Sequence, residues 1–287
     1  MEDSAIPRDA NTRERQLTHW LLAHGSVLVG YSGGVDSAYL ACVAVDILGP
    51  EKVLAVIGRS ASYPDAQWSV ARNVARRFRI PLEEMETNEL ADDRYAANPT
   101  NRCYFCKNEL WGKLVPLARA RGMAVVIDGT NSDDLQGHRP GAVSAREQGV
   151  RSPLAELGFT KDEIRTLSRA RDIPTWSQPS SPCLSSRIPY GTAVTPERLA
   201  RIGDAEQRLR DIGIAGDMRV RYHGDLARVE LSRVVLADWL RPERTAVLRD
   251  AVRSAGFTDV EIDPRGYRSG SLNVLETRHE IATLRRD

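Results

Sequence analysis

The pattern of apolar and polar residues in the first part of the chain predicts strands that alternate with helices. Four short stretches, most of them continuously apolar, have the pattern of strands buried on both faces, as in a parallel sheet. They cover residues 26–30, 53–57, 82–86 and 124–127. Helical patterns lie between and after them, at residues 35–48, 65–78, 103–121, 140–148 and 160–170. We therefore expect an α/β fold with a doubly wound parallel sheet.

The pattern changes in the last third of the chain. Residues 172–195 are rich in proline and serine and show little helical periodicity, which is typical of a functional or disordered loop. The elements expected after it are a helix at 196–209, an alternating hairpin at 219–231, a helix at 243–255 and a strand at 258–262. These elements indicate a smaller C-terminal α/β domain, so we predict two domains, at residues 12–192 and 193–278.

Composition argues against several classes of protein. The chain has 40 Lys+Arg and 39 Asp+Glu residues, so its net charge is +1 and no global field attracts nucleic acid. No apolar run approaches the roughly 18 residues of a spanning helix, and the polar start lacks a secretory pattern, so we expect no membrane partner. Four cysteines are too few for a disulfide framework, which predicts free thiols and a cytoplasmic protein. Cys42 lies on an apolar helix face and is expected in the core.

A glycine-rich loop at residues 31–37 joins the first predicted strand to the first long helix. Gly33 and Gly34 allow the backbone to approach an anion, and the new helix directs unpaired N–H groups toward it. Ser32 and Ser37 add hydroxyl donors. No lysine follows the second glycine, as a P-loop requires, and the third glycine of the dinucleotide fingerprint is absent. The loop predicts a phosphate site, although a plain strand-to-helix turn is the structural alternative.

The order Ser-Gly-Gly-x-Asp-Ser resembles the signature of the PP-loop ATP pyrophosphatases, which cleave ATP between the α and β phosphates and adenylylate a substrate. Asp36, on the first helical turn, is placed to hold a Mg²⁺ that bridges phosphates, or simply to start the helix favourably. Asp128 and Gly129 end another strand, at the edge where open α/β sheets bind ligands. Arg59 and Ser60 end the second strand, where an adenine or ribose pocket is expected.

Three cysteines have positions that suggest chemistry. Cys103 and Cys106 form a C-x-x-C pair at a helix start, where the helix dipole favours thiolate. Cys183 lies in a polar, proline-containing loop, which is an unusual place for a core cysteine. Three thiolates without a clear fourth ligand fit a [4Fe–4S] cluster with one open iron better than a closed zinc site. A redox pair, or zinc completed by Asp133 or His138, remains the alternative.

Arginines form a further group in the second half of the chain. Arginine forks bind phosphate and carboxylate, but arginines that alternate along a hairpin also serve as a solvated face. Glu230, on the same strand face as Arg228, is expected either to pair with that arginine or to bind metal. The arginines of this group are Arg187, Arg219, Arg221, Arg228 and Arg268.

Together these motifs resemble one family, the ATP-dependent sulfur transferases of nickel-pincer cofactor biosynthesis (the LarE family). The resemblance runs in the same order from about residue 12 to 275, and the Ser-Pro-Cys-Leu-x-Ser-Arg-Ile-Pro-Tyr-Gly loop is its most specific part. One departure is the Pro64-Asp65 pair, where many relatives carry proline and arginine. The matching segments are Ser32–Ser37, Asn101–Lys107, Asp128–Asp134, Arg139–Gly141, Val150–Leu154 and Ser181–Gly191.

The resemblance implies an enzyme that uses ATP and Mg²⁺ to adenylylate the carboxylates of a small nucleotide, pyridinium-3,5-dicarboxylate mononucleotide. Sulfur then displaces AMP and leaves a thiocarboxylate. In one branch the sulfur comes from a single cysteine, here Cys183, which becomes dehydroalanine. In another branch three cysteines hold a [4Fe–4S] cluster, and Cys103, Cys106 and Cys183 favour that branch here.

The resemblance further implies a homo-oligomer, a hexamer in the family, and arginines that bind the substrate phosphate. Arg187, Arg228 and Arg268 are the candidates for that phosphate, and Glu230 is a candidate Mg²⁺ ligand beside Asp36. The principal alternative is a PP-loop tRNA thiolation enzyme, which would need a basic RNA-binding surface. An amidotransferase-type synthetase would need no C-x-x-C pair but would need a partner that supplies ammonia. A regulatory ATP-binding module would not need Cys183 in its proline-containing loop.

Overall fold

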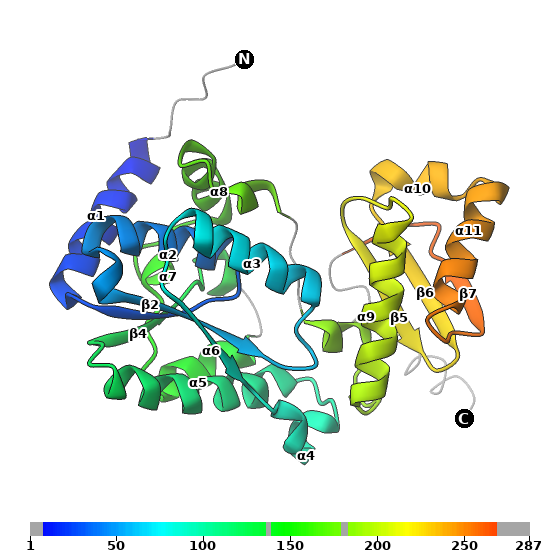
Figure 1. Ribbon diagram of the computed structural model, residues 1–287, viewed down its shortest axis with the longest axis horizontal. Coiled ribbons are helices and arrows are strands. Elements are labelled where there is room, and N and C mark those ends of the chain that lie inside the picture. Colours follow the sequence, from blue (N-terminus) through cyan, green and yellow to red (C-terminus); the bar gives the residue numbers. More distant parts are fainter. Residues whose placement is uncertain (1–7, 136–138, 179–182, 269–287) are drawn as a thin grey trace, which may run out of the picture. The chain divides into compact units, whose positions relative to one another are not determined.

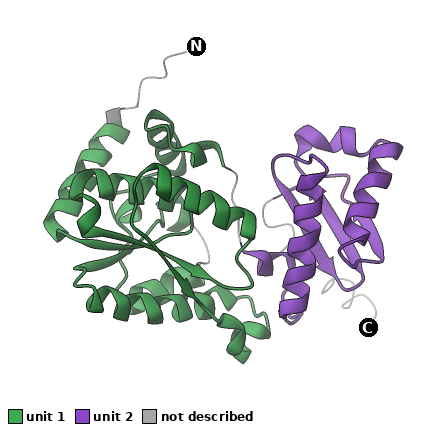
Figure 2. Ribbon diagram, in the orientation of Figure 1, with its two compact units in different colours: residues 1–181 green, residues 182–287 purple. Residues whose placement is uncertain are grey.

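The computed structural model describes residues 8–135, 139–178 and 183–268. The chain forms two compact units, residues 1–181 and 182–287 (Figure 2). The second unit therefore begins ten residues or so before the predicted start of the small domain at 193, and it includes Cys183.

The first unit is built on the expected parallel sheet. Its four strands are all parallel and lie in the order β3-β2-β1-β4. β1 is central, with Gly30 opposite Val56 of β2 on one side and Asp128 of β4 on the other. The strands are β1 (Val27–Gly30), β2 (Val53–Arg59), β3 (Leu82–Glu86) and β4 (Val125–Asp128).

Helices cover both faces of this sheet (Figure 1), so the doubly wound fold is confirmed. One face is covered by α1 (Arg8–His24), α2 (Val35–Leu48), α3 (Asp65–Arg77) and α8 (Lys161–Ala170). The other face is covered by α5 (Arg102–Ala120) and α6 (Pro140–Glu147). Short helices α4 (Asp93–Ala96) and α7 (Pro153–Glu156) complete the unit, with 3₁₀ turns at η1 (Pro50–Lys52), η2 (Glu89–Ala91), η3 (Asp133–Leu135) and η4 (Pro174–Ser177).

The two cores on either side of the sheet follow the two-residue period of a strand. Val27 and Val29 of β1 point into the core with α2, while Leu28 points into the core with Trp111 of α5. Cys42 lies in the first core, as expected, and burial raises the pKa of its thiol to about 12. This cysteine is therefore held as an unreactive thiol.

The second unit contains a three-stranded sheet in the order β5-β6-β7, in which β5 and β6 form the predicted hairpin and β7 runs parallel to β6. The short helix α10 was not expected from the sequence. No helix among the described residues is long and apolar enough to cross a membrane. The elements of this unit are η5 (Leu184–Arg187), α9 (Pro196–Asp211), β5 (Met218–His223), β6 (Leu226–Leu231), α10 (Arg233–Trp239), α11 (Pro242–Arg253) and β7 (Asp259–Ile262).

A buried ion pair anchors the loop that carries Cys183 to α9 of the second unit. The Arg187 guanidinium donates to both oxygens of Glu206 on α9, at 2.8 and 3.0 Å, and each side chain is 1% exposed. Arg187 also donates to the carbonyl oxygen of Cys183 at 3.1 Å. Glu206 compensates the buried charge of Arg187, which gives this arginine a structural role, and its contact with substrate phosphate stays a prediction.

The same pair makes the second unit sensitive to acid. Burial disfavours the ionised carboxyl of Glu206, but the charge and hydrogen bonds of Arg187, with a hydrogen bond from the Val220 amide, hold its pKa below 4.5. A carboxyl whose pKa is depressed by folding stabilises the fold fully above its unfolded pKa. That stabilisation is lost as the pH falls through the folded pKa.

We expect Glu206→Gln to lower the free energy of unfolding by about 3–5 kcal/mol at pH 7, because it leaves the Arg187 charge buried and unpaired. Urea unfolding of the variant and the wild type measures the difference, which should shrink as the pH is lowered below 4.5. Asp204→Asn, which removes an exposed ion pair with Arg208 on the same helix, is the matched control. Equal losses in the two variants would contradict this account.

Candidate functional site

The glycine loop has the geometry of an anion site. β1 ends at Gly30, and α2 begins at Val35 with Gly34 as its N-cap, so no side chain caps the first turn from that position. The Ser32 and Ser37 hydroxyls lie 3.1 Å apart across the loop. The first N–H groups of α2, its positive dipole end and two hydroxyls therefore converge on one place, as phosphate binding requires.

Gly33 makes this loop possible by packing against α3. Its φ is +66°, and a Cβ built on it would lie 2.3 Å from Cβ and 2.7 Å from Cα of Ala71. Only glycine satisfies both the backbone conformation and the close approach.

Asp128 and Gly129 lie beside the loop, as expected for residues that end a neighbouring strand. The strand order reverses between β1 and β4, and open α/β sheets bind ligands in the crevice at that point. A Cβ on Gly129 would lie 2.8 Å from the amide nitrogen of Ser37, so the two loops pack closely. The Asp128 carboxylate accepts hydrogen bonds from the Thr130 amide (3.1 Å) and hydroxyl (3.0 Å) and from Ser152 Oγ (2.7 Å).

Two residues that sequence reasoning missed hold Asp36. Lys161 Nζ lies 2.5 Å from Asp36 Oδ2, and Asn131 Nδ2 donates to Oδ1 at 3.3 Å. Lys161 is the first residue of α8, whose start is set by a capping box between Thr160 and Glu163. The capping box is visible in the sequence. However, Lys161 and Asp36 are far apart along the chain, so the sequence does not indicate that Lys161 reaches the glycine loop.

The donor set at this edge fits Mg²⁺. Protein Mg²⁺ sites use one or two carboxylates and complete the shell with phosphates and water. Asp36 and Asp128 supply such oxygens next to the anion site. No cluster of three or more His, Cys, Asp or Glu side chains suited to a metal is found among the described residues.

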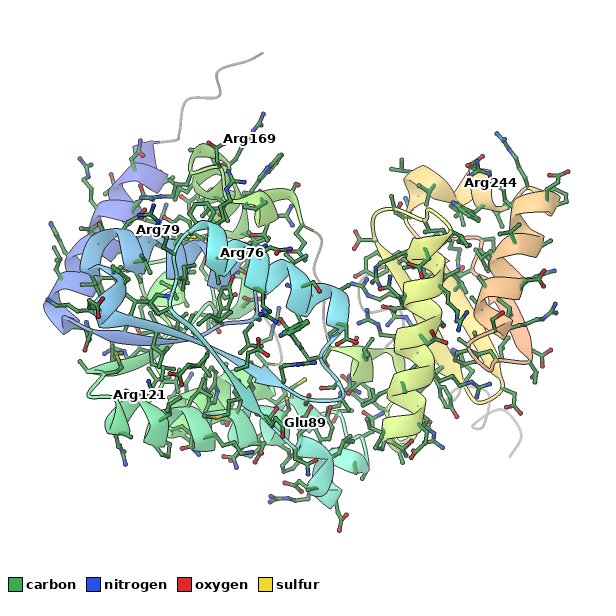
Figure 3. The ribbon with its side chains drawn as sticks, in the orientation of Figure 1. Arg76, Arg79, Glu89, Arg121, Arg169 and Arg244 are labelled. Atoms are coloured by element: carbon green, nitrogen blue, oxygen red, sulfur yellow. The ribbon has the colours of Figure 1, made fainter. Side chains whose placement is uncertain are left out.

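Arg59 and Ser60 end β2, as expected, but their side chains have partners within the unit. Arg59 lies 4.5 Å from the Trp68 ring and 3.6 Å from Asp65, so the aspartate that departs from the family pattern pairs with it. Ser60 donates to Glu89 Oε1 at 2.6 Å; Glu89, labelled in Figure 3, is 2% exposed. These contacts shape the carboxyl end of β2.

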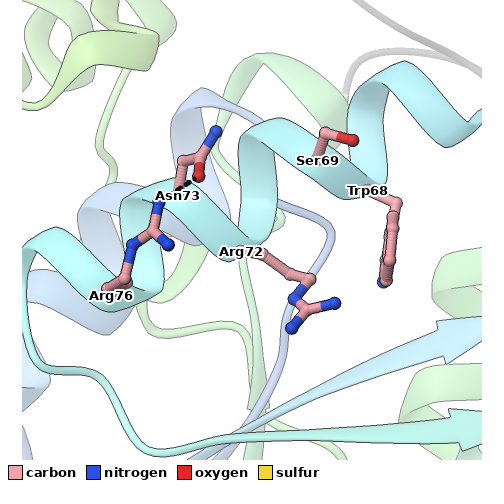
Figure 4. A pocket seen from close by; sticks show the side chains of 5 residues that line it. All are labelled: Trp68, Ser69, Arg72, Asn73 and Arg76. Atoms are coloured by element: carbon pink, nitrogen blue, oxygen red, sulfur yellow. Dashed lines mark hydrogen bonds between the residues drawn. The ribbon is translucent and has the colours of Figure 1, made fainter.

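Two surface pockets of about 380 Å³ each lie elsewhere on the first unit. One runs along α3 and is lined by Trp68, Ser69, Arg72, Asn73 and Arg76 (Figure 4). The other lies between the start of α5 and α6, and its lining includes Asn101, Tyr104, Arg139 and Val143. The expected ATP residues line neither pocket.

The three cysteines are divided between the two units. Cys103 is exposed and Cys106 half-buried on the first turn of α5, whereas Cys183 directly precedes η5 in the second unit. Asp133 Oδ2 accepts a hydrogen bond from the backbone N–H of Lys161 at 2.8 Å. His138, the other candidate zinc ligand, lies outside the described residues. The described geometry therefore leaves cluster and zinc as proposals.

The remaining predicted residues lie in the second unit. Glu230, expected to bind Mg²⁺, is 2% exposed and accepts two hydrogen bonds from Arg221, at 2.8 and 3.0 Å. Arg228 pairs with Glu261 and Arg268 with Asp263, each at 3.4 Å. Arg228 and Arg268 keep 22% and 32% of their side chains exposed.

We expect Gly33→Ala to lower the free energy of unfolding by about 2–4 kcal/mol, since it adds both a strained φ and a clash with α3. Gly122→Ala is the matched control, because Gly122 has nearly the same φ (+65°) with no atom within 4 Å of a built Cβ. Chemical denaturation of both variants separates the two causes. A Gly33→Ala loss no larger than that of the control would show that the contact with Ala71 is unimportant.

Comparison with known proteins gives the family. The NAD synthase family model matches residues 16–108. An uncharacterized protein of Synechocystis sp. is 44% identical over 251 residues, which cover 88% of this chain and 93% of that protein. The pyridinium-3,5-bisthiocarboxylic acid mononucleotide synthase of Lactiplantibacillus plantarum is 34% identical over 262 residues, 90% of this chain and 92% of that protein. The structure of NMN synthetase from Francisella tularensis is 18% identical with a TM-score of 0.49, over 60% of this chain and 75% of that one.

The match to the synthase extends over both compact units and agrees with the resemblance expected from the motifs. The chain therefore belongs to the LarE family, the ATP-dependent sulfur transferases of nickel-pincer cofactor biosynthesis, within the PP-loop ATP pyrophosphatases.

Proposed function

We propose that this protein adenylylates the carboxylates of pyridinium-3,5-dicarboxylate mononucleotide and converts them to thiocarboxylates. The observation that carries the proposal is the 34% identity, over 90% of the chain, to a synthase of the bisthiocarboxylic acid mononucleotide. The anion site formed by the glycine loop, Asp36 and Lys161 supports the use of ATP.

In the first step a substrate carboxylate oxygen attacks the α-phosphorus of ATP, and the bond from that phosphorus to the β-phosphate oxygen breaks. Pyrophosphate leaves with the bonding electrons. The first N–H groups of α2 and the hydroxyls of Ser32 and Ser37 bind the phosphates. Lys161 neutralises charge on the leaving pyrophosphate. Asp36 and Asp128 would hold Mg²⁺, which would supply further charge neutralisation.

In the second step a sulfur nucleophile attacks the acyl carbon, and the bond from that carbon to the adenylate oxygen breaks. AMP leaves and carries the former carboxylate oxygen. If Cys183 is the donor, its thiolate forms a thioester. Loss of the Cys183 Cα proton then breaks the Cβ–S bond, which leaves dehydroalanine and a substrate thiocarboxylate. We favour the other route, in which Cys103, Cys106 and Cys183 would hold a [4Fe–4S] cluster. Their thiols are the right ligand type, and the cluster would supply the sulfide that attacks the acyl carbon.

The second unit supplies the substrate contacts in this proposal. Arg228 and Arg268 bind the nucleotide phosphate, since both keep part of their side chains exposed. Arg187 instead holds the backbone of Cys183. We further propose a homo-oligomer of cytoplasmic location, in keeping with ATP use and four free thiols. Size-exclusion chromatography with light scattering tests the oligomer.

Lys161→Ala is expected to slow pyrophosphate release about 10²-fold, the usual cost of removing one donor from developing charge. The assay follows pyrophosphate after mixing ATP, Mg²⁺ and the dicarboxylate nucleotide. Lys113→Ala is the matched control, because Lys113 is a partly exposed lysine that pairs with Glu109 on α5. Equal rates in the two variants would remove Lys161 from the mechanism.

Cys183→Ala should abolish thiocarboxylate formation while pyrophosphate release continues, because adenylylation needs no thiol. Mass spectrometry of the nucleotide measures the product, and Cys42→Ala, in the core, should retain both activities. Continued sulfur transfer by the Cys183 variant would overturn the donor assignment. Thiolation of tRNA instead of the nucleotide would overturn the proposed substrate.

Iron and sulfide analysis of anaerobically prepared protein decides between the two sulfur routes. We expect a brown protein whose iron is lost on replacing Cys103 or Cys106 by alanine. A colourless protein that contains zinc would refute the cluster.

A further inference from the structure

Gln67 is a buried polar side chain that contacts the glycine loop and has no part in the chemistry proposed above. It lies in the first turn of α3 and is 5% exposed. Its Nε2 donates to the carbonyl oxygen of Ser32 at 3.1 Å, and the Tyr63 hydroxyl donates to the same oxygen at 2.9 Å. These two donors orient the peptide group between Ser32 and Gly33. Because N–H and C=O of a trans peptide point in opposite directions, the Gly33 N–H is directed away from both donors.

The other end of the Gln67 amide binds Gln178. Gln67 Oε1 accepts a hydrogen bond from Gln178 Nε2 at 2.6 Å. The chemistry of the groups determines the direction of both bonds: the Ser32 carbonyl can only accept, so Gln67 presents its nitrogen there and its oxygen to Gln178. Gln178 must therefore donate. A substitution that removes this donor breaks the connection.

Gln178 lies at the end of the first unit that leads to Cys183. Its carbonyl oxygen accepts from Arg165 of α8 at 3.2 Å, so its backbone is held as well as its side chain. Cys183 follows five residues later in the sequence. Gln178 Oε1 is buried and accepts no hydrogen bond from any residue that the structure describes.

We infer that Gln67 and Gln178 are positioning residues that connect the ATP-binding loop to the segment carrying the sulfur-transfer cysteine. The inference rests on the proposed function. A nucleotide that accepts a hydrogen bond from the Gly33 N–H contacts the peptide group whose carbonyl oxygen is bound by Gln67. Gln67 in turn accepts a hydrogen bond from Gln178. Ser32, Gln67 and Gln178 thus form one hydrogen-bond chain. It restrains the start of the segment toward Cys183 while the adenylate is present.

The catalytic test separates adenylylation, measured as pyrophosphate released, from sulfur transfer, measured as thiocarboxylate formed per pyrophosphate. Gln178→Leu should leave pyrophosphate release nearly unchanged and lower the ratio about fivefold, the factor that one hydrogen bond supplies. Gln178→Lys keeps a donor of similar length and should restore the ratio. Gln148→Leu is the matched control, because Gln148 is half-buried and donates to Asn108 at 3.1 Å.

Substituting the two residues that donate to the Ser32 carbonyl separates the effect on ATP binding from the effect on sulfur transfer. Tyr63→Phe should raise KM for ATP and leave the ratio of thiocarboxylate to pyrophosphate unchanged, because Tyr63 contacts Ser32 but not Gln178. Gln67→Leu should raise KM for ATP and lower the ratio. If Gln178→Leu matches the control, or Gln178→Lys is as impaired as Gln178→Leu, the two glutamines only pack and the inference is overturned.

Hydrogen exchange with a non-hydrolysable ATP analogue tests the connection without turnover. The analogue should slow amide exchange at residues 174–178 in the wild type and in Gln148→Leu, but not in Gln67→Leu. This result in a protein that forms no thiocarboxylate would uphold the connection and refute only the proposed substrate. If the analogue does not change the rate of amide exchange at these residues in the wild type, the connection is overturned, whatever the substrate.

Discussion

The close contact between Gly33 and Ala71 is the constraint on which the glycine loop and its anion site depend. It brings the loop after β1 against α3 at a distance that no other residue type permits. With the loop in that position, Tyr63 and Gln67 reach the Ser32 carbonyl, and α2 begins at the sheet edge where β1 and β4 end. The packing of α3 on the glycine loop thereby determines where the first N–H groups of α2 point.

Much of the first unit follows from local sequence patterns. The strands and the helices α2, α3 and α5 have bounds within two residues of expectation at almost every end, because buried strands and helix boundaries have strong local signals. Asp128 and Gly129 were placed at the ligand-binding edge of the sheet by a topological rule, but the sequence did not indicate that their strand lies next to β1. Lys161 was missed because its partner Asp36 is 125 residues away, and no local pattern reports such a pairing.

Arg187 shows a different limit of sequence reasoning. In a polar loop an arginine is expected to face solvent or a ligand, yet this one is buried by Glu206, a charged residue on the apolar face of α9. The buried neighbours of Glu206 on that helix are Leu199, Ile202, Ala205 and Leu209. A lone carboxylate within an apolar helical stripe is a signal for a buried partner, because an unpaired charge there is costly. The sequence contains that signal, but it does not identify which arginine responds.

The loop around Cys183 is held through its main chain. Arg187 donates to the Cys183 carbonyl and Arg221 to the Ser186 carbonyl, and neither contact involves the sulfur. A reaction that alters or consumes the side chain of Cys183 therefore leaves both anchors in place. The two anchors are therefore independent of what is bound to the Cys183 sulfur, and they hold the loop to the second unit by its carbonyl oxygens alone.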